Sequence, residues 1–211
     1  MYQKTEAVIL SRKNFQEADR LLTIYTKDFG KISCIAKGVR KPTSRKSGHL
    51  ENGSWCEVFI AKGKNLDILT EVELKKAFGL DNLKSEKTNE IYHFLELVDS
   101  LTPHNQKNIE VFSLLVNFLK KIELSQNFSL VSTVFKLRLL SILGFFSADN
   151  LKLSNAKTLL GRLQNEDLNK LQDEIIISEN DYLKLSTFLD SIIEGVSERK
   201  LKTNRFIHAQ L

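Results

Sequence analysis

Residues 21–36 read Leu-Leu-Thr-Ile-Tyr-Thr-Lys-Asp-Phe-Gly-Lys-Ile-Ser-Cys-Ile-Ala. The first and last six residues of this stretch are rich in β-branched and apolar side chains, and the turn sequence Asp28-Phe29-Gly30 lies between them. Two such runs joined by a short glycine-containing turn are typical of a β-hairpin. The stretch therefore predicts that the N-terminal part of the chain is built from antiparallel strands.

Three further strand-like runs surround this hairpin. Residues 5–10 precede it, residues 55–62 and 66–74 follow it, and Gly63 marks a second tight turn. Five strands, two hairpins and a long connection between the third and fourth strands favour a small closed barrel. The OB-fold is the commonest barrel of that strand count and often binds single-stranded nucleic acid. An SH3-like barrel is the competing topology.

Before Phe78, apolar residues recur at every second position. After Phe78 they recur every three to four positions, which predicts helices. Residues 130–146 are apolar around most of the helix circumference, so this helix is expected to be central and buried, ending near Gly144. The predicted class is α+β, with a five-stranded OB-fold barrel in residues 1–80 and an all-α domain in residues 81–211. The predicted helices cover residues 89–101, 109–122, 130–146, 180–196 and 197–209.

The positive charge is unevenly distributed. The chain carries a net charge of +5. Residues 1–80 hold 15 Lys and Arg against 9 Asp and Glu, whereas residues 81–211 hold 16 against 17. This asymmetry favours one binding module joined to one scaffolding or partner-binding module.

Cysteine usage and hydropathy point to a reduced, soluble protein. Cys34 and Cys56 are the only cysteines, and each lies in an apolar, strand-like run, so we expect both to be buried and reduced. No apolar run approaches the length of a membrane span, and no leader-like segment opens the sequence. These features predict a cytoplasmic protein that does not associate with membranes.

A basic loop connects the third and fourth predicted strands. Residues 31–50 carry six Lys and Arg and no acidic residue. Clustered cations bind phosphate backbones because binding releases condensed counterions. A solvated surface loop is the alternative. The candidate nucleic-acid contacts are Lys37, Arg40, Lys41, Arg45 and Lys46, with Lys62 and Lys64 extending the patch beside the second hairpin.

Four aromatic residues of the barrel could stack on bases. They are Phe15, Tyr25, Phe29 and Trp55. Only exposed rings can stack, and aromatic residues of small barrels more often belong to the core. Phe29, at a turn, is expected to be the most exposed of the four.

No catalytic constellation is evident in the sequence. Glu17, Asp19 and Arg20 are interpreted as a structural ion pair before the second strand, not as a catalytic acid pair. The four histidines are scattered, and no GxxxxGK[ST] phosphate-binding loop occurs. The sequence therefore predicts a protein that is not an enzyme.

Several strings resemble, in order along the chain, the RecO family of bacterial recombination and DNA-repair mediators. Taken singly each string is only moderately specific, and together they extend over nearly the whole chain. They are Glu17–Thr23 followed by Thr26, Gly30 and Lys31; Ala36–Lys41 with Ser44 and Arg45; Leu69–Leu74; Phe135–Leu140 with Leu143, Gly144 and Phe145; and Leu201–Arg205.

The resemblance implies binding of single- and double-stranded DNA, annealing of complementary strands and no catalysis. It implies partnership with a RecR-like mediator, with single-strand DNA-binding protein and with the RecA recombinase. An apolar pocket and a cation would be needed for the acidic, phenylalanine-ended tail of the single-strand DNA-binding protein. Lys136 and Arg138, in the predicted central helix, are the candidates for that contact.

One departure from the family concerns zinc. Many members carry a four-cysteine zinc motif directly after the segment that corresponds to Leu143-Gly144-Phe145, whereas residues 146–153 contain no cysteine or histidine. A structural zinc site needs four such ligands. We therefore expect no metal and no cofactor.

Two other functions remain open from the sequence. A generic OB-fold RNA-binding factor would explain the charge asymmetry but not the C-terminal motifs. An adaptor protein with an incidental basic loop would bind its partners tightly and nucleic acid weakly.

Overall fold

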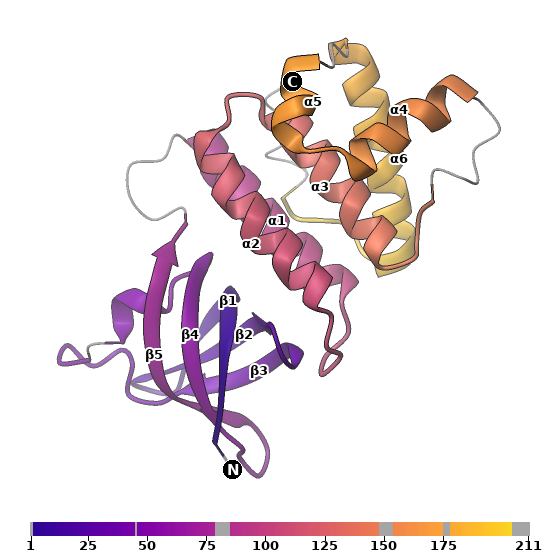
Figure 1. Ribbon diagram of the computed structural model, residues 1–211. Coiled ribbons are helices and arrows are strands. Elements are labelled where there is room, and N and C mark those ends of the chain that lie inside the picture. Colours follow the sequence, from indigo (N-terminus) through magenta and orange to yellow (C-terminus); the bar gives the residue numbers. More distant parts are fainter. Residues whose placement is uncertain (1, 45, 79–84, 148–153, 175–177, 204–211) are drawn as a thin grey trace.

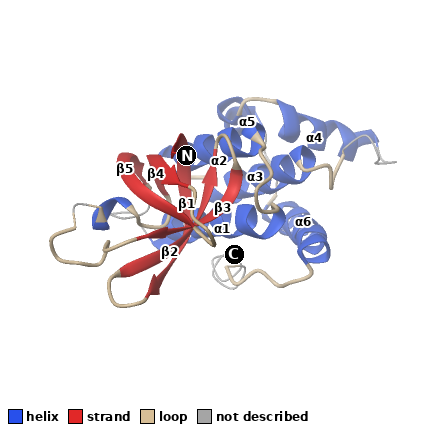
Figure 2. Cartoon of the chain, turned by 90° about the horizontal axis from the view of Figure 1, so that it is seen from below, coloured by secondary structure: helices blue, strands red, loops and turns tan. Residues whose placement is uncertain are grey.

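A computed structural model describes residues 2–44, 46–78, 85–147, 154–174 and 178–203. A β-barrel forms one end of the molecule and a group of helices forms the other, with α1 and α2 between them (Figure 1). The view from below shows the strands fanning out beside the helices (Figure 2). The α+β class predicted from the sequence is confirmed.

Five strands close into a barrel in the order β1-β2-β3-β5-β4. All neighbouring strands are antiparallel except β3 and β5, which are parallel. This is the strand count and Greek-key connectivity of an OB-fold, as predicted. The strands are β1 (Tyr2–Phe15), β2 (Asp19–Thr26), β3 (Gly30–Ala36), β4 (Ser54–Ala61) and β5 (Asp67–Ala77).

The long strand β1 closes the barrel by pairing on both sides. Its first half pairs with β4, from Tyr2 to Val8, and its second half pairs with β2. Ala7 and Val8 pair with both neighbours, and the register with β2 shifts just beyond them, between Ile9 and Ser11. Alternate side chains of every strand fill the interior, as the buried Cys56, Val58 and Ile60 of β4 illustrate.

Six helices follow the barrel in the described part of the chain. Glu198, with φ of 54°, ends the last of them, so the helix predicted over residues 197–209 is wrong as far as residue 203. Its remainder lies outside the described residues. The short α4 and α5 were not predicted. The helices are α1 (Ser85–Leu101), α2 (Ile109–Leu124), α3 (Phe128–Ile142), α4 (Ser154–Asn165), α5 (Leu168–Glu174) and α6 (Glu179–Ser197).

Helix α3 is the central helix, as its apolar circumference predicted. Phe135 of α3 stacks on Phe94 of α1 at a ring-centroid distance of 4.2 Å and contacts Phe118 of α2 at 5.3 Å. Gly144, with φ of 79°, follows the helix end, and the N–H of Phe145 donates to the Leu140 carbonyl. This arrangement is a glycine-dependent Schellman ending. None of the described helices has the length and apolar character to cross a lipid bilayer.

The helices and the barrel share a hydrophobic core. Val8 and Leu10 of β1 are buried within the same cluster as the residues of α1, α2 and α3. The phenol of Tyr25 donates to the Asn108 carbonyl at 3.4 Å. Strand β5 ends at Ala77 and α1 begins at Ser85. The predicted domain boundary between residues 80 and 81 lies outside the described residues and stays a prediction.

Candidate nucleic-acid interface

The basic loop leaves the barrel after β3 and returns to it at β4, and its base is firmly held. Val39 is fully buried in the barrel core. The N–H of Gly38 donates to Oδ1 of Asp19 at 2.7 Å, and the N–H of Arg40 donates to the Ala18 carbonyl at 2.9 Å. A 3₁₀ turn over Ser47–His49 completes the connection. The loop therefore projects from a fixed base beside the β1–β2 turn.

Three of the predicted contacts, Lys37, Arg40 and Lys41, are exposed on this loop. The guanidinium of Arg40 donates to the Gln16 carbonyl at 3.3 Å, which leaves its other donors free for a ligand. Lys46 is half-buried and its ammonium donates to the Thr70 carbonyl of β5, so it fixes the loop as well as adding charge. Arg45 lies outside the described residues.

The two hairpin lysines differ from each other. Both are exposed, but Lys62 forms an ion pair of 2.7 Å with Asp67, which offsets its charge. Lys31, counted in the basic stretch, belongs to the interior instead. Its side chain is 7% exposed and its ammonium lies 3.3 Å from Oδ1 of Asp99 on α1. Lys31 therefore joins the barrel to the helices.

The aromatic candidates lie mostly in packed positions. Tyr25 is fully buried, and Phe29 packs against the barrel core. Trp55 is half-buried, and its indole N–H donates to Oε2 of Glu6 at 3.0 Å. Phe15, at 38% exposure, is the accessible ring of the four, so the expectation that Phe29 is the most exposed is wrong.

The interpretation of Glu17, Asp19 and Arg20 as one ion pair is also wrong. Arg20 pairs with Glu51, at 3.3 Å, and donates to the Ser47 carbonyl at the same distance. Asp19 accepts from the backbone of the basic loop instead. Asp19 thus holds the start of the β3–β4 connection, and Arg20 holds its end.

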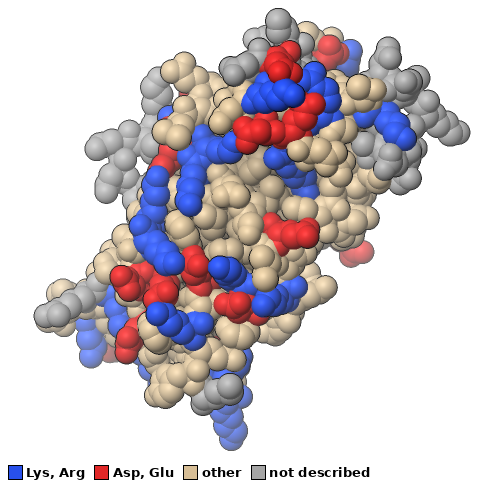
Figure 3. Space-filling model, in the orientation of Figure 1, with Lys and Arg blue, Asp and Glu red and all other residues tan. Residues whose placement is uncertain are grey.

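A second group of cations was missed by the sequence analysis. Figure 3 shows a run of basic side chains crossing from the barrel to the helices. The Lys75 and Lys120 ammonium groups lie 5.3 and 4.4 Å from the Trp55 ring centroid, although β5 and α2 are far apart in sequence. Acidic neighbours offset some of this charge, as in the contact between Lys76 and Glu123. The members are Lys75, Lys76 and Lys120, named here the β5–α2 band.

Lys136 and Arg138, the predicted partner contacts, have structural partners within the chain. Lys136 is 1% exposed and its ammonium lies 2.7 Å from Oδ1 of Asp190. Arg138 donates to the carbonyls of Leu163, at 3.0 Å, and Glu166, at the C-terminal end of α4. Burial lowers the pKa of the Arg138 guanidinium. The burial of Lys136 does not support a direct contact with a partner.

The two cysteines are free and buried, as predicted. Burial raises the pKa of each thiol to about 12, so neither is a ready nucleophile. Among the described residues, no group of three or more His, Cys, Asp and Glu side chains is placed to hold a metal ion. Residues 148–153 lie outside that description, and the absence of zinc stays a prediction.

Comparison with known proteins identifies the family. Residues 1–78 match the family model for the N-terminal part of recombination protein O, and residues 90–147 match the model for its C-terminal part. The DNA repair protein RecO of Desulforamulus reducens is 27% identical over 240 residues, covering 97% of this chain and 93% of that protein.

Other relatives match over a shorter stretch. The DNA repair protein RecO of Heliobacterium modesticaldum is 34% identical over 142 residues, which are 67% of this chain and 51% of that protein. The DNA repair protein RecO of Pelotomaculum thermopropionicum is 29% identical over 142 residues, which are 67% of this chain and 55% of that protein. The chain thus spans about half the length of these two relatives. With both family models matched in order on an OB-fold barrel and its helices, the chain belongs to the RecO family of DNA repair proteins.

Proposed function

We propose that this protein is a non-enzymatic recombination mediator that binds single- and double-stranded DNA through the basic loop of its OB-fold barrel. It would anneal complementary strands and help to load a recombinase onto DNA coated by single-strand DNA-binding protein. The observation that carries the proposal is the basic loop itself, where Lys37, Arg40 and Lys41 are exposed above a base held by Asp19 and Val39.

The anchored base supports binding to phosphates in two ways. A loop that is already ordered loses less conformational entropy on binding than a mobile one. Its exposed ammonium and guanidinium groups release condensed counterions from DNA without reading bases, so binding would be independent of sequence. The β5–α2 band offers further positive charge where the barrel meets the helices.

Annealing would follow from the same electrostatics. Two strands held near one positive surface repel each other less than in free solution, so they meet and pair more readily.

The helical part would serve as the docking platform. Its shared core with the barrel would keep docked partners at a fixed position relative to the DNA. The proposed partners are a RecR-like mediator, single-strand DNA-binding protein and the RecA recombinase. We propose these partners because the chain belongs to the RecO family.

Salt dependence tests the binding mechanism. Fluorescence anisotropy with a labelled single strand should give a log–log slope near −3 to −5 if about four to six phosphates are neutralised, at about −0.7 per contact. A flat response between low and moderate salt would contradict backbone capture. Stronger binding to RNA than to DNA of the same sequence would favour the RNA-binding alternative.

An annealing assay tests the mediator role. The protein should accelerate pairing of complementary strands, both bare and coated with single-strand DNA-binding protein. Acceleration of bare strands alone would restrict the proposal to annealing and contradict the role at coated DNA.

A further inference from the structure

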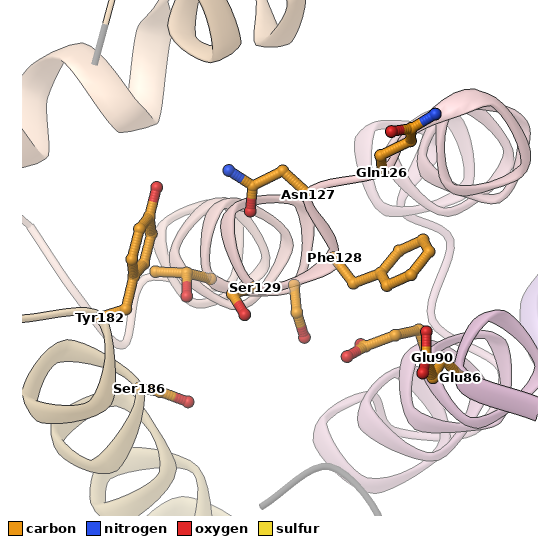
Figure 4. Close-up of a pocket in the computed structure, with 10 residues that line it drawn as sticks. Glu86, Glu90, Gln126, Asn127, Phe128, Ser129, Tyr182 and Ser186 are labelled. Atoms are coloured by element: carbon orange, nitrogen blue, oxygen red, sulfur yellow. The ribbon is translucent and has the colours of Figure 1, made fainter. Parts of the chain in front are cut away.

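A cavity of about 540 Å³ opens between α1, the first turns of α3, and α6. It lies in the helical part, apart from the basic loop. Figure 4 shows side chains from the three helices arranged around the space. Those that matter here are Glu86 and Glu90 of α1, Phe128 and Ser132 of α3, and Tyr182 and Ser186 of α6.

Glu90 is the unusual residue of this cavity. It is 3% exposed, and its Oε2 atom has no hydrogen-bond partner among the described residues. The hydroxyl groups of Ser132 and Tyr182 are likewise buried. A buried carboxylate without a paired charge is destabilising, so such a group is expected to have a use.

Lys136, whose positive charge acts on Glu90, is bound to other groups. The ammonium of Lys136 lies 2.7 Å from Oδ1 of Asp190 and donates to the hydroxyl of Ser186 at 3.1 Å. It is therefore engaged with α6 on the inner side of the cavity. Lys136 acts on Glu90 only as a nearby charge.

Burial dominates the electrostatics of Glu90. Burial, the largest cause, raises the pKa of its carboxyl to about 7, while a hydrogen bond from Ser132 and the charge of Lys136 lower it and Asp190 raises it. A cation bound against Oε2 would favour the ionised form, because an opposite charge within a few ångströms lowers a carboxyl pKa.

We propose that this cavity binds a small organic ammonium compound, with its cationic group on the Glu90 carboxylate. Glu86 lies one turn before Glu90 on α1 and is exposed, so its charge draws cations to the mouth. The ring of Phe128 provides an apolar wall for an alkyl chain (Figure 4). The volume is in the range of small-molecule sites, about 300–1,000 Å³.

The hydroxyl groups favour ammonium over a metal ion. An alkylammonium carries three N–H donors, and hydroxyl-bearing side chains of α3 and α6, Ser132 and Tyr182 among them, line the same cavity. A metal ion would need more carboxylate oxygens close together, and among the described residues no such cluster occurs.

Isothermal titration calorimetry of the full chain with 1,4-diaminobutane tests the proposal. At pH 8 we expect saturable binding at one site per chain, and no binding of 1,4-butanediol, a neutral compound of the same length. Glu90→Gln keeps the shape of the side chain and should weaken binding at least tenfold. Glu86→Gln should weaken it by a few-fold, since its carboxylate acts from the mouth.

Glu71→Gln is the matched control, because it removes the same charge from an exposed position on β5. Its affinity for 1,4-diaminobutane should equal that of the wild type. The proposed site would be wrong if Glu71→Gln lost as much affinity as Glu90→Gln, or if Glu90→Gln bound 1,4-diaminobutane as tightly as the wild type. It would also be wrong if millimolar wild-type protein gave no binding heat with a 10-fold molar excess of 1,4-diaminobutane. Thermal melting of Glu90→Gln verifies that this variant is folded.

The pH dependence of binding gives an independent readout. Among the described residues, the charged groups around Glu90 are Glu86 on α1, Lys136 on α3 and Asp190 on α6, with the buried His93 one turn further along α1. Because the cation binds ionised Glu90, affinity should rise from pH 6 to pH 8. Affinity that falls or stays level over this range would contradict the assignment of Glu90.

Discussion

The carboxylate of Asp19, the first residue of β2, accepts a hydrogen bond of 2.7 Å from the backbone N–H of Gly38 in the basic loop. Gly38 has a φ of 65°, so the chain turns sharply at the point where the carboxylate holds it. An acidic residue thus shapes a site whose expected ligand is itself an anion. The negative charge of Asp19 should weaken DNA binding, whereas its hydrogen bond to the basic loop should strengthen DNA binding by holding the loop in place.

Asp19→Ala should therefore lower DNA affinity by a few-fold even though it removes a negative charge. The loss of a hydrogen bond to a charged group should also lower the free energy of unfolding by about 1.5–3 kcal/mol. Anisotropy at fixed salt and chemical denaturation measure the two effects. Glu17→Ala is the control, since it removes the same charge from an exposed neighbour and should bind DNA slightly better. Tighter binding by both variants would mean that loop anchoring is unimportant.

Replacing Lys37, Arg40 and Lys41 together by Ala should weaken single-strand binding by about tenfold or more and make the salt slope less negative by about 2. These side chains are exposed, so the unfolding transition should stay where it is. Lys46 is left in place because it also ties the loop to β5.

The matched control is a triple Ala variant of Lys170, Lys184 and Lys200, which removes three exposed cations from the helical part. It should change the salt slope little. If both triple variants lose affinity equally, DNA responds to overall charge and the basic loop is not a distinct site.

The barrel was predictable because its signals are local. The alternation in β4 and the turn at Gly30 fix strands within a few residues, and five such strands leave few closed arrangements. The short α4 and α5 were missed because seven to twelve residues carry too few turns for a clear apolar period. The helix predicted from residue 197 onward does not continue through residues 198–203, because an apolar period cannot reveal a left-handed residue such as Glu198.

The site was only partly predictable because charge compensation acts across space. Lys62 is neutralised by Asp67 across a turn, and Lys31 by Asp99 on another element. Lys136 looked like a surface cation beside apolar residues, but its partner Asp190 comes 54 positions later. The β5–α2 band depends on α2 lying against the barrel, a placement that neither segment indicates alone.

Gly30→Ala should strongly destabilise the protein. Gly30 has a φ of 68°, which costs an ordinary residue roughly 1–2 kcal/mol, and an added Cβ would fall 1.9 Å from the Gln106 carbonyl oxygen. We expect a loss of more than about 2 kcal/mol by urea denaturation, with weakened docking of the barrel on the helices. Gly48→Ala, where an added Cβ meets nothing within 4 Å, should change stability by less than about 0.5 kcal/mol. Equal stability of the two variants would contradict the close approach.

Lys136→Met should destabilise the helical core by about 3–5 kcal/mol, because it leaves Asp190 buried without its ammonium partner. The double variant Lys136→Met/Asp190→Asn should regain most of that loss, and Lys184→Met, at an exposed position, should be neutral. Binding of partner peptides to folded protein should be unaffected in the double variant. Selective loss of peptide binding in the stable double variant would instead restore Lys136 as a partner contact.

Glu90 should make stability fall as pH rises. Its carboxyl pKa is raised from 4.5 to about 7 in the folded protein, mainly by burial, so the folded state binds more protons than the unfolded state between these values. The free energy of unfolding should therefore decline from about pH 5 to pH 7, by on the order of 3 kcal/mol from this group, and level off above. Urea denaturation at pH 5, 6, 7 and 8 measures the decline.

Glu90→Gln separates this effect from the other carboxyl groups. Its amide cannot ionise, so the variant should match the wild type near pH 5 and exceed its stability at pH 8, while Glu71→Gln should follow the wild type throughout. Saturating 1,4-diaminobutane should flatten the wild-type decline, because a bound ammonium compensates the ionised Glu90 carboxylate. Parallel profiles for Glu90→Gln and the wild type would show that the Glu90 carboxyl titrates at its ordinary pKa and is in contact with water.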